Sequence, residues 1–288
     1  MWVVIGYVVV LGSVFGGFAL SGGHLAALFQ PLELLMIAGA AIGAFLVGND
    51  IAIIKATLKV FPTLFKGSKY TSELYRQLLL LLYRLLSKMR ADGLMAIESD
   101  VERPYESALF AEYPLVIANH HIVEFLSDYL RLIVSGKADP FQLENLMDNE
   151  IDTHHAEAEF PVHSIAKMGD GLPAFGIVAA VMGVVHTMES VGLPPAELGM
   201  LIAHALVGTF LGILLAYGFV TPLANLCEQK IHESAIPFHC IKVTLIASLN
   251  GNPPSIAVEF GRKVLFSNVR PSFNEFDDAI REAKSKGI

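Results

Sequence analysis

Carboxylates are the side chains best suited to carry a cation through a membrane, and this 288-residue sequence keeps them out of its longest apolar stretches. A transporter usually holds an ionisable group at membrane depth, because a buried charge is costly and is kept only for function. If ions cross the membrane with this chain, we therefore expect a partner to supply the carrier. The nearest carboxylates stand at stretch ends or in turns, where we expect water or headgroups to reach them: Glu33, Asp50, Asp170, Glu189 and Glu197.

Three other polar side chains approach membrane depth. His186 and His204 can titrate near neutral pH and relay protons, but both lie near the outer interface, where a hydrogen-bonded structural histidine is the commoner case. Thr209 lies deeper in its apolar stretch. Its hydroxyl can bond back to the preceding turn or line a water path, and the sequence leaves both interpretations open.

Two prolines mark the ends of apolar stretches. Pro173 opens one stretch and Pro222 closes the next. Proline fits the first turn of a helix and also stops a helix near its end, so helix boundaries explain both residues. The functional alternative is that both lie at the cytoplasmic end of their helices, where a kink could pivot a span against a soluble domain.

A dense group of mixed charges lies in a more polar part of the sequence. Such a group is most often a solvated face, and the alternative is a surface that binds a partner of complementary charge. Its members are Arg90, Asp92, Glu98, Asp100, Glu102 and Arg103.

The histidines at 120–121 and 154–155 do not predict a metal site. Adjacent histidines on a helix point about 100° apart, so they do not converge on one ion. Cys227 and Cys240 lack CxxC spacing, and we expect free thiols. Because the sequence has neither a spaced metal motif nor a nucleophile elbow, we expect no cofactor and no enzyme activity.

Composition predicts the elements that position these groups. Hydrophobic residues make up 53% of the sequence and charged residues only 17%, which indicates a membrane protein. A spanning helix needs about 20 mostly apolar residues, and no strand pattern competes, so we predict an all-α polytopic fold with four transmembrane helices. The four stretches are about 1–20, 32–54, 172–188 and 198–223.

The basic residues predict the orientation of these spans. All 20 Lys and Arg fall in two blocks, from Lys55 to Lys167 and from Lys230 to Lys286. Connections rich in Lys and Arg stay cytoplasmic, so we place a large cytoplasmic helical domain at 55–170, a cytoplasmic C-terminal tail at 224–288, and both termini inside. The extracytoplasmic turns lack Lys and Arg and are Ser21–Pro31 and Glu189–Glu197.

The two predicted span pairs, residues 1–54 and 171–223, are rich in small residues at helical spacing. Because the hydrophobic effect does not drive helices together in lipid, close approach depends on such residues. Packing within the chain explains any single pair, but four pairs in four spans leave surface for other subunits, so we infer an oligomer. The pairs are Gly12 and Gly16, Gly39 and Gly43, Gly208 and Gly212, and Ala179 and Gly183.

The predicted cytoplasmic domain alternates apolar runs with charges. Thr71–Arg90 contains the unbroken run Leu78–Leu82, which is too short to span a membrane and predicts a buried or interfacial helix. In Pro114–Val134 and Phe141–Phe160, apolar residues recur three and four positions apart along the chain, which is typical of amphipathic helices.

Several segments of the sequence match a known family. They resemble the MotA family of flagellar stator proteins, within the MotA/TolQ/ExbB proton channel family, and the resemblance covers nearly the whole chain. The segments are IGYVVVLGSVFGGF, GGHLAALFQPLELLMIAGAAIGAFLVGN, GDGLPAFGIVAAVMGVVHTMES, AELGMLIAHALVGTFLGILLAYGFVTPLA and NGNPPSIAVEFGRKVLFSNVRPSF.

This resemblance implies a flagellar motor stator subunit in the bacterial cytoplasmic (inner) membrane. In the family, five such chains form a ring around a dimer of a single-span MotB-type partner. The partner carries the ion-binding aspartate, which would supply the carboxylate that the predicted spans of this chain lack. Arg90 and Glu98 correspond to the family's charged contact with the rotor protein FliG. Pro173 and Pro222 match prolines that couple ion flow to movement, and Thr209 matches a channel-facing threonine.

The residue at position 180 bears on the transported ion. Sodium-type relatives carry threonine where this sequence has Ala180. A sodium ion needs several oxygen ligands after losing its water, whereas a proton needs one carboxylate, so the missing hydroxyl favours H+. Backbone carbonyls and the partner could still complete a sodium site, and a sodium-driven stator stays as an alternative.

We therefore predict a proton-driven stator subunit that converts an ion gradient into torque, contacts membrane lipid and binds no nucleic acid. An energiser of the ExbB or TolQ type encloses a similar partner, but such proteins usually have three spans, whereas four are predicted here. A polytopic enzyme built on the histidines and a passive scaffold without an ion path are the more distant alternatives.

Overall fold

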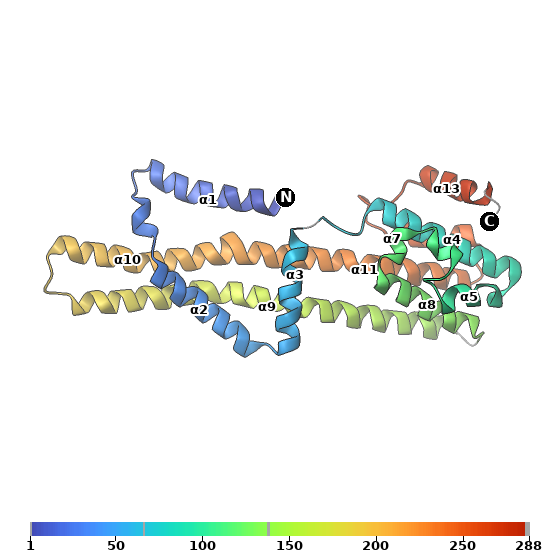
Figure 1. Cartoon of the computed structure of the whole chain (residues 1–288), viewed down its shortest axis with the longest axis horizontal. Helices are drawn as coiled ribbons and strands as arrows, with labels where there is room; N and C mark the ends of the chain where they lie inside the picture. The colour runs from blue at the N-terminus through green and yellow to red at the C-terminus, as the bar shows by residue number, and fades with distance from the viewer. Residues whose placement is uncertain (1, 66, 137–138, 286–288) are drawn as a thin grey trace. The chain divides into compact units, whose positions relative to one another are not determined.

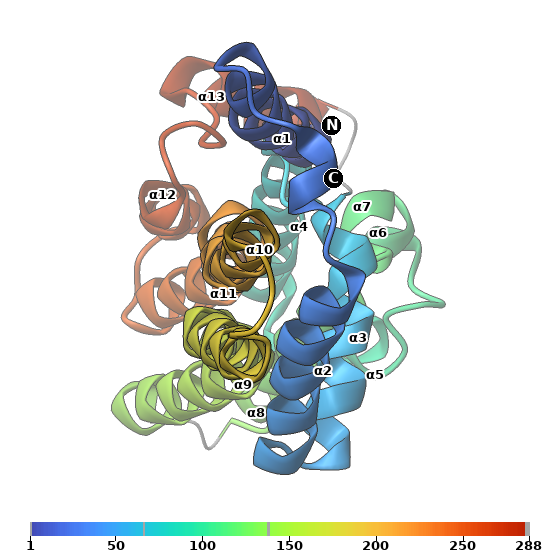
Figure 2. The ribbon, with the colours of Figure 1, turned by 90° about the vertical axis from the view of Figure 1, so that its left-hand side faces the viewer.

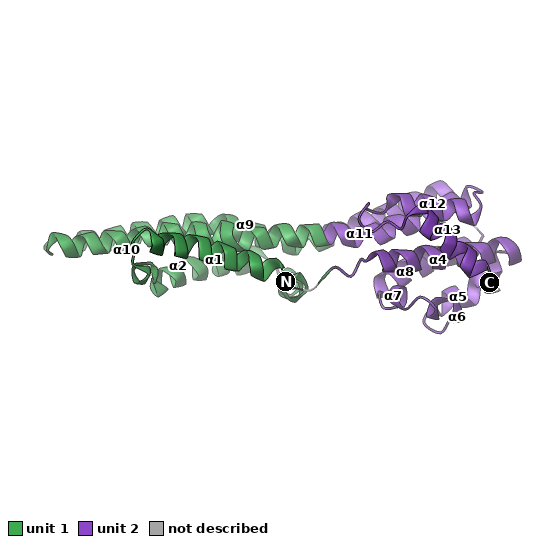
Figure 3. Cartoon of the chain, turned by 90° about the horizontal axis from the view of Figure 1, so that it is seen from above, with its two compact units in different colours: residues 1–67, 158–230 green, residues 68–157, 231–288 purple. Residues whose placement is uncertain are grey.

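The computed structural model describes residues 2–65, 67–136 and 139–285, and within these ranges every regular element is a helix (Figure 1). Four helices are long and apolar enough to cross a membrane, which confirms the predicted all-α fold with four apolar helices. The chain divides into two compact units (Figure 3). Unit 1 comprises residues 1–67 and 158–230, and unit 2 comprises residues 68–157 and 231–288.

Unit 1 begins with two apolar helices. Helix α1 (Trp2–Leu20) is apolar on every face and has no buried residue. It contacts a later part of the unit through Tyr7, whose hydroxyl donates to the Phe219 carbonyl at 3.1 Å. Gly22, at φ +86°, turns the chain into the short helix η1 (Leu25–Leu28). Helix α2 (Pro31–Gly48) follows, with proline at its first position, where no amide hydrogen is needed.

Helix α2 is shorter than the predicted second span. It ends at Gly48, whereas the sequence predicted about residue 54, because Asn49 interrupts it. The Asn49 side-chain amide donates to the Phe45 carbonyl at 2.7 Å and satisfies an acceptor of the last turn. The chain restarts as α3 (Ile51–Leu64), an amphipathic helix that buries Thr57 and exposes two lysines.

Two very long helical stretches complete unit 1 and continue into unit 2. One is α9 (Pro140–Glu189), and the other is a run of α10 (Pro195–Ile213), the π-helical segment η3 (Leu214–Val220) and α11 (Thr221–Leu249). Seen from the end of the molecule, α9 and α10 lie side by side (Figure 2). The predicted helix Phe141–Phe160 and the third span are therefore parts of one helix.

The prolines do not bound these helices as the sequence suggested. Pro173 lies inside α9, and the helix continues through Pro222 rather than ending there. Proline removes one backbone hydrogen bond, and a π-helical turn is one of the local adjustments that accommodate the loss. Such a segment, η3, ends at Val220, two residues before Pro222.

Unit 2 packs short and medium helices around a leucine-rich helix. Leu78, Leu79, Leu81 and Leu82 of α4 are all 0% exposed, so of the two predicted settings for this helix the structure shows the buried one. The predicted helix Pro114–Val134 is divided in two at residues 118–119. The helices of this unit not yet named are α4 (Ser72–Asp92), η2 (Leu94–Ile97), α5 (Glu98–Glu102), α6 (Ala108–Ala111), α7 (Pro114–Ile117), α8 (His120–Val134), α12 (Pro254–Val264) and α13 (Phe273–Ser285).

Candidate functional site

A seam of small residues joins α9 to α10. A Cβ atom placed on Gly212 would lie 2.7 Å from the Leu172 carbonyl oxygen, and one on Gly176 would lie 2.8 Å from the Gly208 carbonyl oxygen. One on Gly183 would lie 2.8 Å from the Ala205 Cβ. No side chain fits at these distances, so the two backbones are in direct contact. Glycine is therefore required at three positions of the seam.

The four predicted small-residue pairs thus divide into two kinds. The pairs in α9 and α10 are used for packing inside the chain, which is the explanation that the sequence analysis gave for any single pair. In α1 and α2, nothing lies within 4 Å of a Cβ atom placed on Gly12, Gly16, Gly39 or Gly43. Those two pairs remain open for contacts outside the chain.

Gly208, next to Thr209, and Ala180 come together at this seam. Gly208, the residue before Thr209, approaches so closely that a Cβ on it would lie 3.2 Å from the Ala180 backbone nitrogen. Thr209 and Ala180 are both half-buried. In the same seam, the Thr187 hydroxyl donates to the Gly183 carbonyl at 2.9 Å.

The Thr209 hydroxyl differs from that of Thr187. Within the described residues it has no hydrogen-bond partner, although a threonine on a helix usually bonds back to the preceding turn. The role of Thr209 in a water or ion path stays a prediction. A half-buried hydroxyl with free bonding capacity is suited to a water or ion path.

The two proline regions also face each other. A Cβ atom on Gly169, one turn before Pro173, would lie 3.2 Å from the Val220 side chain and 3.3 Å from the Thr221 hydroxyl oxygen. Val220 ends the π-helical segment and Thr221 directly precedes Pro222. Two irregular places in two helices are thus in contact, and each lacks one backbone donor.

Glu33 is a functional candidate whose setting the sequence analysis described wrongly. The sequence predicted that water or lipid headgroups reach Glu33, but in the structure the residue is only 8% exposed. It lies on one stripe of α2 with Ile37 and Ala41, which pack against Leu172 and Ala179. Its Oε2 atom is buried with no hydrogen-bond partner among the described residues. The spacing of four between Glu33, Ile37 and Ala41 was the signal that could have revealed this burial.

Arg90 and Glu98 lie close together along the chain in unit 2, at the end of α4 and the start of α5. Both are exposed, and neither has an ion-pair partner in the part of the chain that the structure describes. Asp100, predicted in the same group, is instead buried. It accepts hydrogen bonds from Lys88 at 2.8 Å and from Ser107 at 2.6 Å. The structure thus separates charges that hold the unit together from charges that are free to meet a partner.

The histidines of unit 2 form contacts with each other across helices. The rings of His121 and His154 are 5.8 Å apart between centroids, and those of His155 and His232 are 5.1 Å apart. Burial lowers the pKa of His154, and the neighbouring His121 lowers it further. Among the described residues, no group of three or more ligand-type side chains could hold a metal ion.

These features define a class of protein: a multi-pass membrane protein with a second helical unit that exposes charges without ion-pair partners among the described residues. Two family models match the chain, Motility protein A N-terminal over residues 4–93 and the MotA/TolQ/ExbB proton channel family over residues 117–238. Among curated relatives, Motility protein A of Escherichia coli K12 is 56% identical, covering 99% of this chain and 97% of the relative. Motility protein A of Salmonella typhimurium is 55% identical with the same coverage.

The solved structures agree on the fold. A chain of the structure "C. jejuni MotAB" matches with a TM-score of 0.77 at 20% identity, covering 94% of this chain and 98% of its own length. The flagellar MotAB stator complex from Bacillus subtilis matches with a TM-score of 0.73 at 23% identity, covering 97% and 98%. The chain belongs to the MotA/TolQ/ExbB proton channel family, as the sequence predicted. It is a flagellar stator subunit and not an enzyme.

Proposed function

We propose that this chain forms a proton channel with a MotB-type single-span partner and converts proton flow into torque on the rotor protein FliG. The observation that carries the proposal is the unbonded Thr209 hydroxyl at a tightly packed helix seam that contains no carboxylate of its own. The partner's aspartate would supply the missing acid. That two solved relatives are named as MotAB complexes supports this division of labour.

The proposed arrangement follows from charge and hydropathy. The spans lie within α1, α2, the last part of α9 and the stretch from α10 to η3, in the bacterial inner membrane. The domain at 55–170, the tail at 224–288 and both termini lie in the cytoplasm, because all 20 Lys and Arg fall in the two blocks assigned there. The open glycine pairs of α1 and α2 support a homo-oligomer, for which the family ring of five is the proposed form.

Protons are the proposed ion because Ala180, whose backbone lies against Gly208 at the seam, ends in a methyl group where sodium-type relatives carry threonine. Ala180 offers no oxygen ligand, and one hydroxyl is too few for a dehydrated sodium ion. A proton moving down 100 mV releases about 2.3 kcal/mol, which sets the scale of each step. Cyclic protonation of the partner's aspartate would switch its charge, and Pro173 and Pro222 would act as hinges that pass the resulting movement along α9 and α11.

The first experiment measures rotation of tethered, stator-deficient cells in sodium-free buffer while this chain and its partner are induced together. Stepwise gains in speed are expected. Gains that require added sodium would keep the stator and refute the proton assignment. No rotation in either buffer, with membrane insertion verified, would favour an ExbB or TolQ type energiser or a passive scaffold.

The rotor contact is tested by charge reversal at Arg90 and Glu98. Because neither side chain has an ion pair within the described part of the chain, Arg90→Glu and Glu98→Lys should lower torque without lowering membrane insertion. Arg103→Glu is the matched control, since Arg103 is also exposed and already lies 3.4 Å from Glu106. Unchanged torque in the double reversal would count against the contact.

A further inference from the structure

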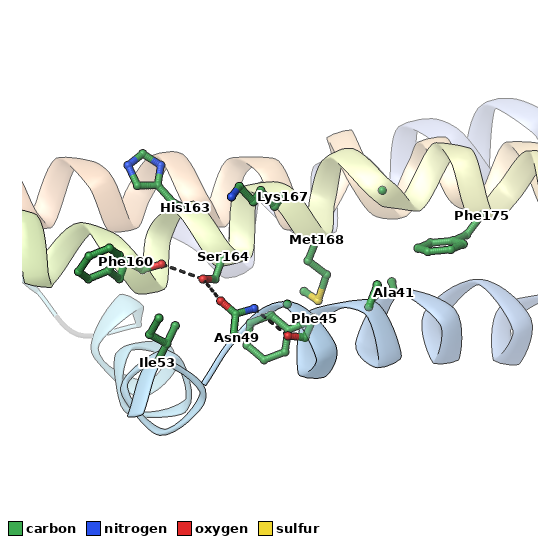
Figure 4. Close-up of a pocket in the computed structure, with 13 residues that line it drawn as sticks. Ala41, Phe45, Asn49, Ile53, Phe160, His163, Ser164, Lys167, Met168 and Phe175 are labelled. Carbon is green, nitrogen blue, oxygen red and sulfur yellow. Dashed lines mark hydrogen bonds between the residues drawn. The ribbon is translucent and has the colours of Figure 1, made fainter. Parts of the chain in front are cut away.

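Unit 1 contains a cavity that the proposed channel does not use. It has a volume of about 450 Å³ and lies between the second half of α2, the start of α3 and residues 160–175 of α9 (Figure 4). It is bounded on one side by the break at Asn49 that shortens α2. The cavity therefore exists because the second apolar helix stops early and the chain turns away.

The lining of the cavity changes from apolar to polar along the helix direction. The part nearer the middle of the predicted spans is lined by Ala41, Phe45 and Phe175. At the other end, the Ser164 hydroxyl donates to the Asn49 side-chain oxygen at 2.5 Å (Figure 4). Lys167 lies one helical turn after Ser164 and lines the same end. An occupant must accordingly be apolar at one end and polar at the other.

The polar end carries one lysine without an ion pair. Lys167 lines the cavity, is exposed and has no ion-pair partner within the described residues. An ammonium group at the polar end of such a cavity attracts an anion, because cationic residues next to a membrane bind anionic headgroups. The charge of Lys167 therefore favours an anionic headgroup over a zwitterionic one.

We propose that this cavity is a binding site for an anionic phospholipid of the inner leaflet, with an acyl chain between α2 and α9 and the phosphate at Lys167 beside Asn49 and Ser164. The proposal rests on the proposed function only through its orientation, which puts this end of the spans at the cytoplasmic face. A second copy of the chain fits less well. An apolar helix would fill the inner part but leave the Lys167 ammonium group without a partner.

The occupant also accounts for the geometry of α2 and α3. The two helices are separated by only Asn49 and Asp50, and α3 presents its lysines to the outside. A lipid seated in the gap would contact both helices and α9 at once. It would thereby fix the angle at which the spanning part passes into the interfacial part.

The test counts lipids on the intact complex with its partner, extracted directly from membranes into nanodiscs. Phosphatidylglycerol and phosphatidylethanolamine retained per chain are measured by native mass spectrometry for wild type, Ala44→Trp and Lys167→Gln. The indole should fill the cavity and remove the retained phosphatidylglycerol. Loss of one lysine contact should weaken phosphatidylglycerol binding about fivefold, equivalent to about 1 kcal/mol.

Two matched variants serve as controls. Lys59→Gln removes a lysine charge of α3 that does not line the cavity, and Ala19→Trp places an indole on an exposed face of α1. Both should retain phosphatidylglycerol within about twofold of wild type, as expected for exposed groups with weak individual contacts.

Three outcomes would overturn the lipid site. They are equal retention in wild type and Ala44→Trp, equal retention of zwitterionic and anionic lipid, and capture of a second copy of the chain by a photoreactive residue at Phe45. Rotation of cells that carry wild type is measured separately. Absent rotation with lipid retained refutes the proposed function alone, and normal rotation without a specific lipid refutes this inference alone.

Discussion

Units 1 and 2 are held together by different means. In unit 2 the contacts are made by large side chains, and α4 buries five successive leucines, Leu78–Leu82, at 8% exposure or less. In unit 1 the closest contacts run from backbone to backbone across the α9–α10 seam, and α1 buries nothing although it is almost wholly apolar. The difference follows from the solvent. In water apolar area drives packing, whereas in lipid it does not, and close approach must substitute for it.

The two units also treat charge differently. In unit 2, Arg84 is 8% exposed and pairs with Glu112, and Lys242 lies 2.6 Å from Asp148. In unit 1, Glu33 is equally buried and one of its oxygens has no hydrogen-bond partner among the described residues. Because large side chains pack unit 2, removing one should destabilise that unit most. Because small residues form the seam of unit 1, adding a large side chain should destabilise unit 1 most.

The largest expected effect is a cavity in unit 2. Leu81→Ala removes a side chain that is 0% exposed and should lower the free energy of unfolding by about 2–5 kcal/mol. Hydrogen exchange of the amides in unit 2 reports the loss. Val8→Ala on exposed α1 is the control and should change little. Similar losses in the two variants would contradict the comparison.

The next largest effect is overpacking of the α9–α10 seam. Gly212→Leu places a side chain where the Leu172 carbonyl is only 2.7 Å away, and should destabilise unit 1 by about 1–3 kcal/mol or more. Thermal unfolding in nanodiscs measures it. Gly43→Leu adds the same side chain where nothing lies within 4 Å, so it should keep the chain's own fold while weakening oligomer assembly in native mass spectrometry. Destabilisation of the fold by Gly43→Leu would place that glycine in a contact inside the chain.

A smaller effect should be confined to unit 2 and depend on pH. Because burial and His121 lower the pKa of His154, the folded chain binds fewer protons here than the unfolded chain. The stability from the neutral ring is fully present above about pH 6.5 and is lost as the pH falls below that value through the lowered pKa. Exchange in unit 2 should thus accelerate on acidification. His154→Gln should flatten this dependence, and a slope unchanged by the substitution would assign it to other groups.

The smallest expected effect is at Glu33. Replacing a buried polar group by an apolar one of similar shape is nearly neutral or slightly stabilising, so Glu33→Leu should shift the stability of unit 1 by less than about 1 kcal/mol. Glu197→Leu is the control, because Glu197 begins α10 and is exposed. A large loss of stability in Glu33→Leu would reveal a bonding partner for the carboxylate, such as bound water.

The sequence predicted the features that depend on composition and period. The all-α fold, its four apolar helices and the buried leucine helix follow from apolar runs, and family membership follows from long matching segments. The predictions that failed concern tertiary context. Glu33 looked accessible because it stands near a helix end, but a stripe with Ile37 and Ala41 buries it. Pro222 looked like a helix stop, since propensity alone gives no sign of the π-helical turn that carries the helix through it.

The candidate site was predictable only in part, because the sequence identifies residues but not the side chains that they contact. Arg90 and Glu98 were identified by resemblance, and only side-chain geometry could show that Asp100 is committed to Lys88 and Ser107. Likewise, the sequence left two interpretations of Thr209. A choice between them requires knowing what the hydroxyl contacts in the assembled channel, which the sequence does not give.

The π-helical segment η3 also alters the angular phase of the helix that carries it. Each residue of a regular α-helix advances the side-chain direction by about 100°, so widening one turn rotates every later position relative to an uninterrupted helix. A helical wheel drawn through Pro195–Ile213 and extended past Val220 therefore assigns Pro222 and the residues after it to the wrong face. Deleting a single residue from Leu214–Val220 would let this segment return to regular α-helical geometry, so the widened turn would disappear while the residues after it would keep nearly the same side.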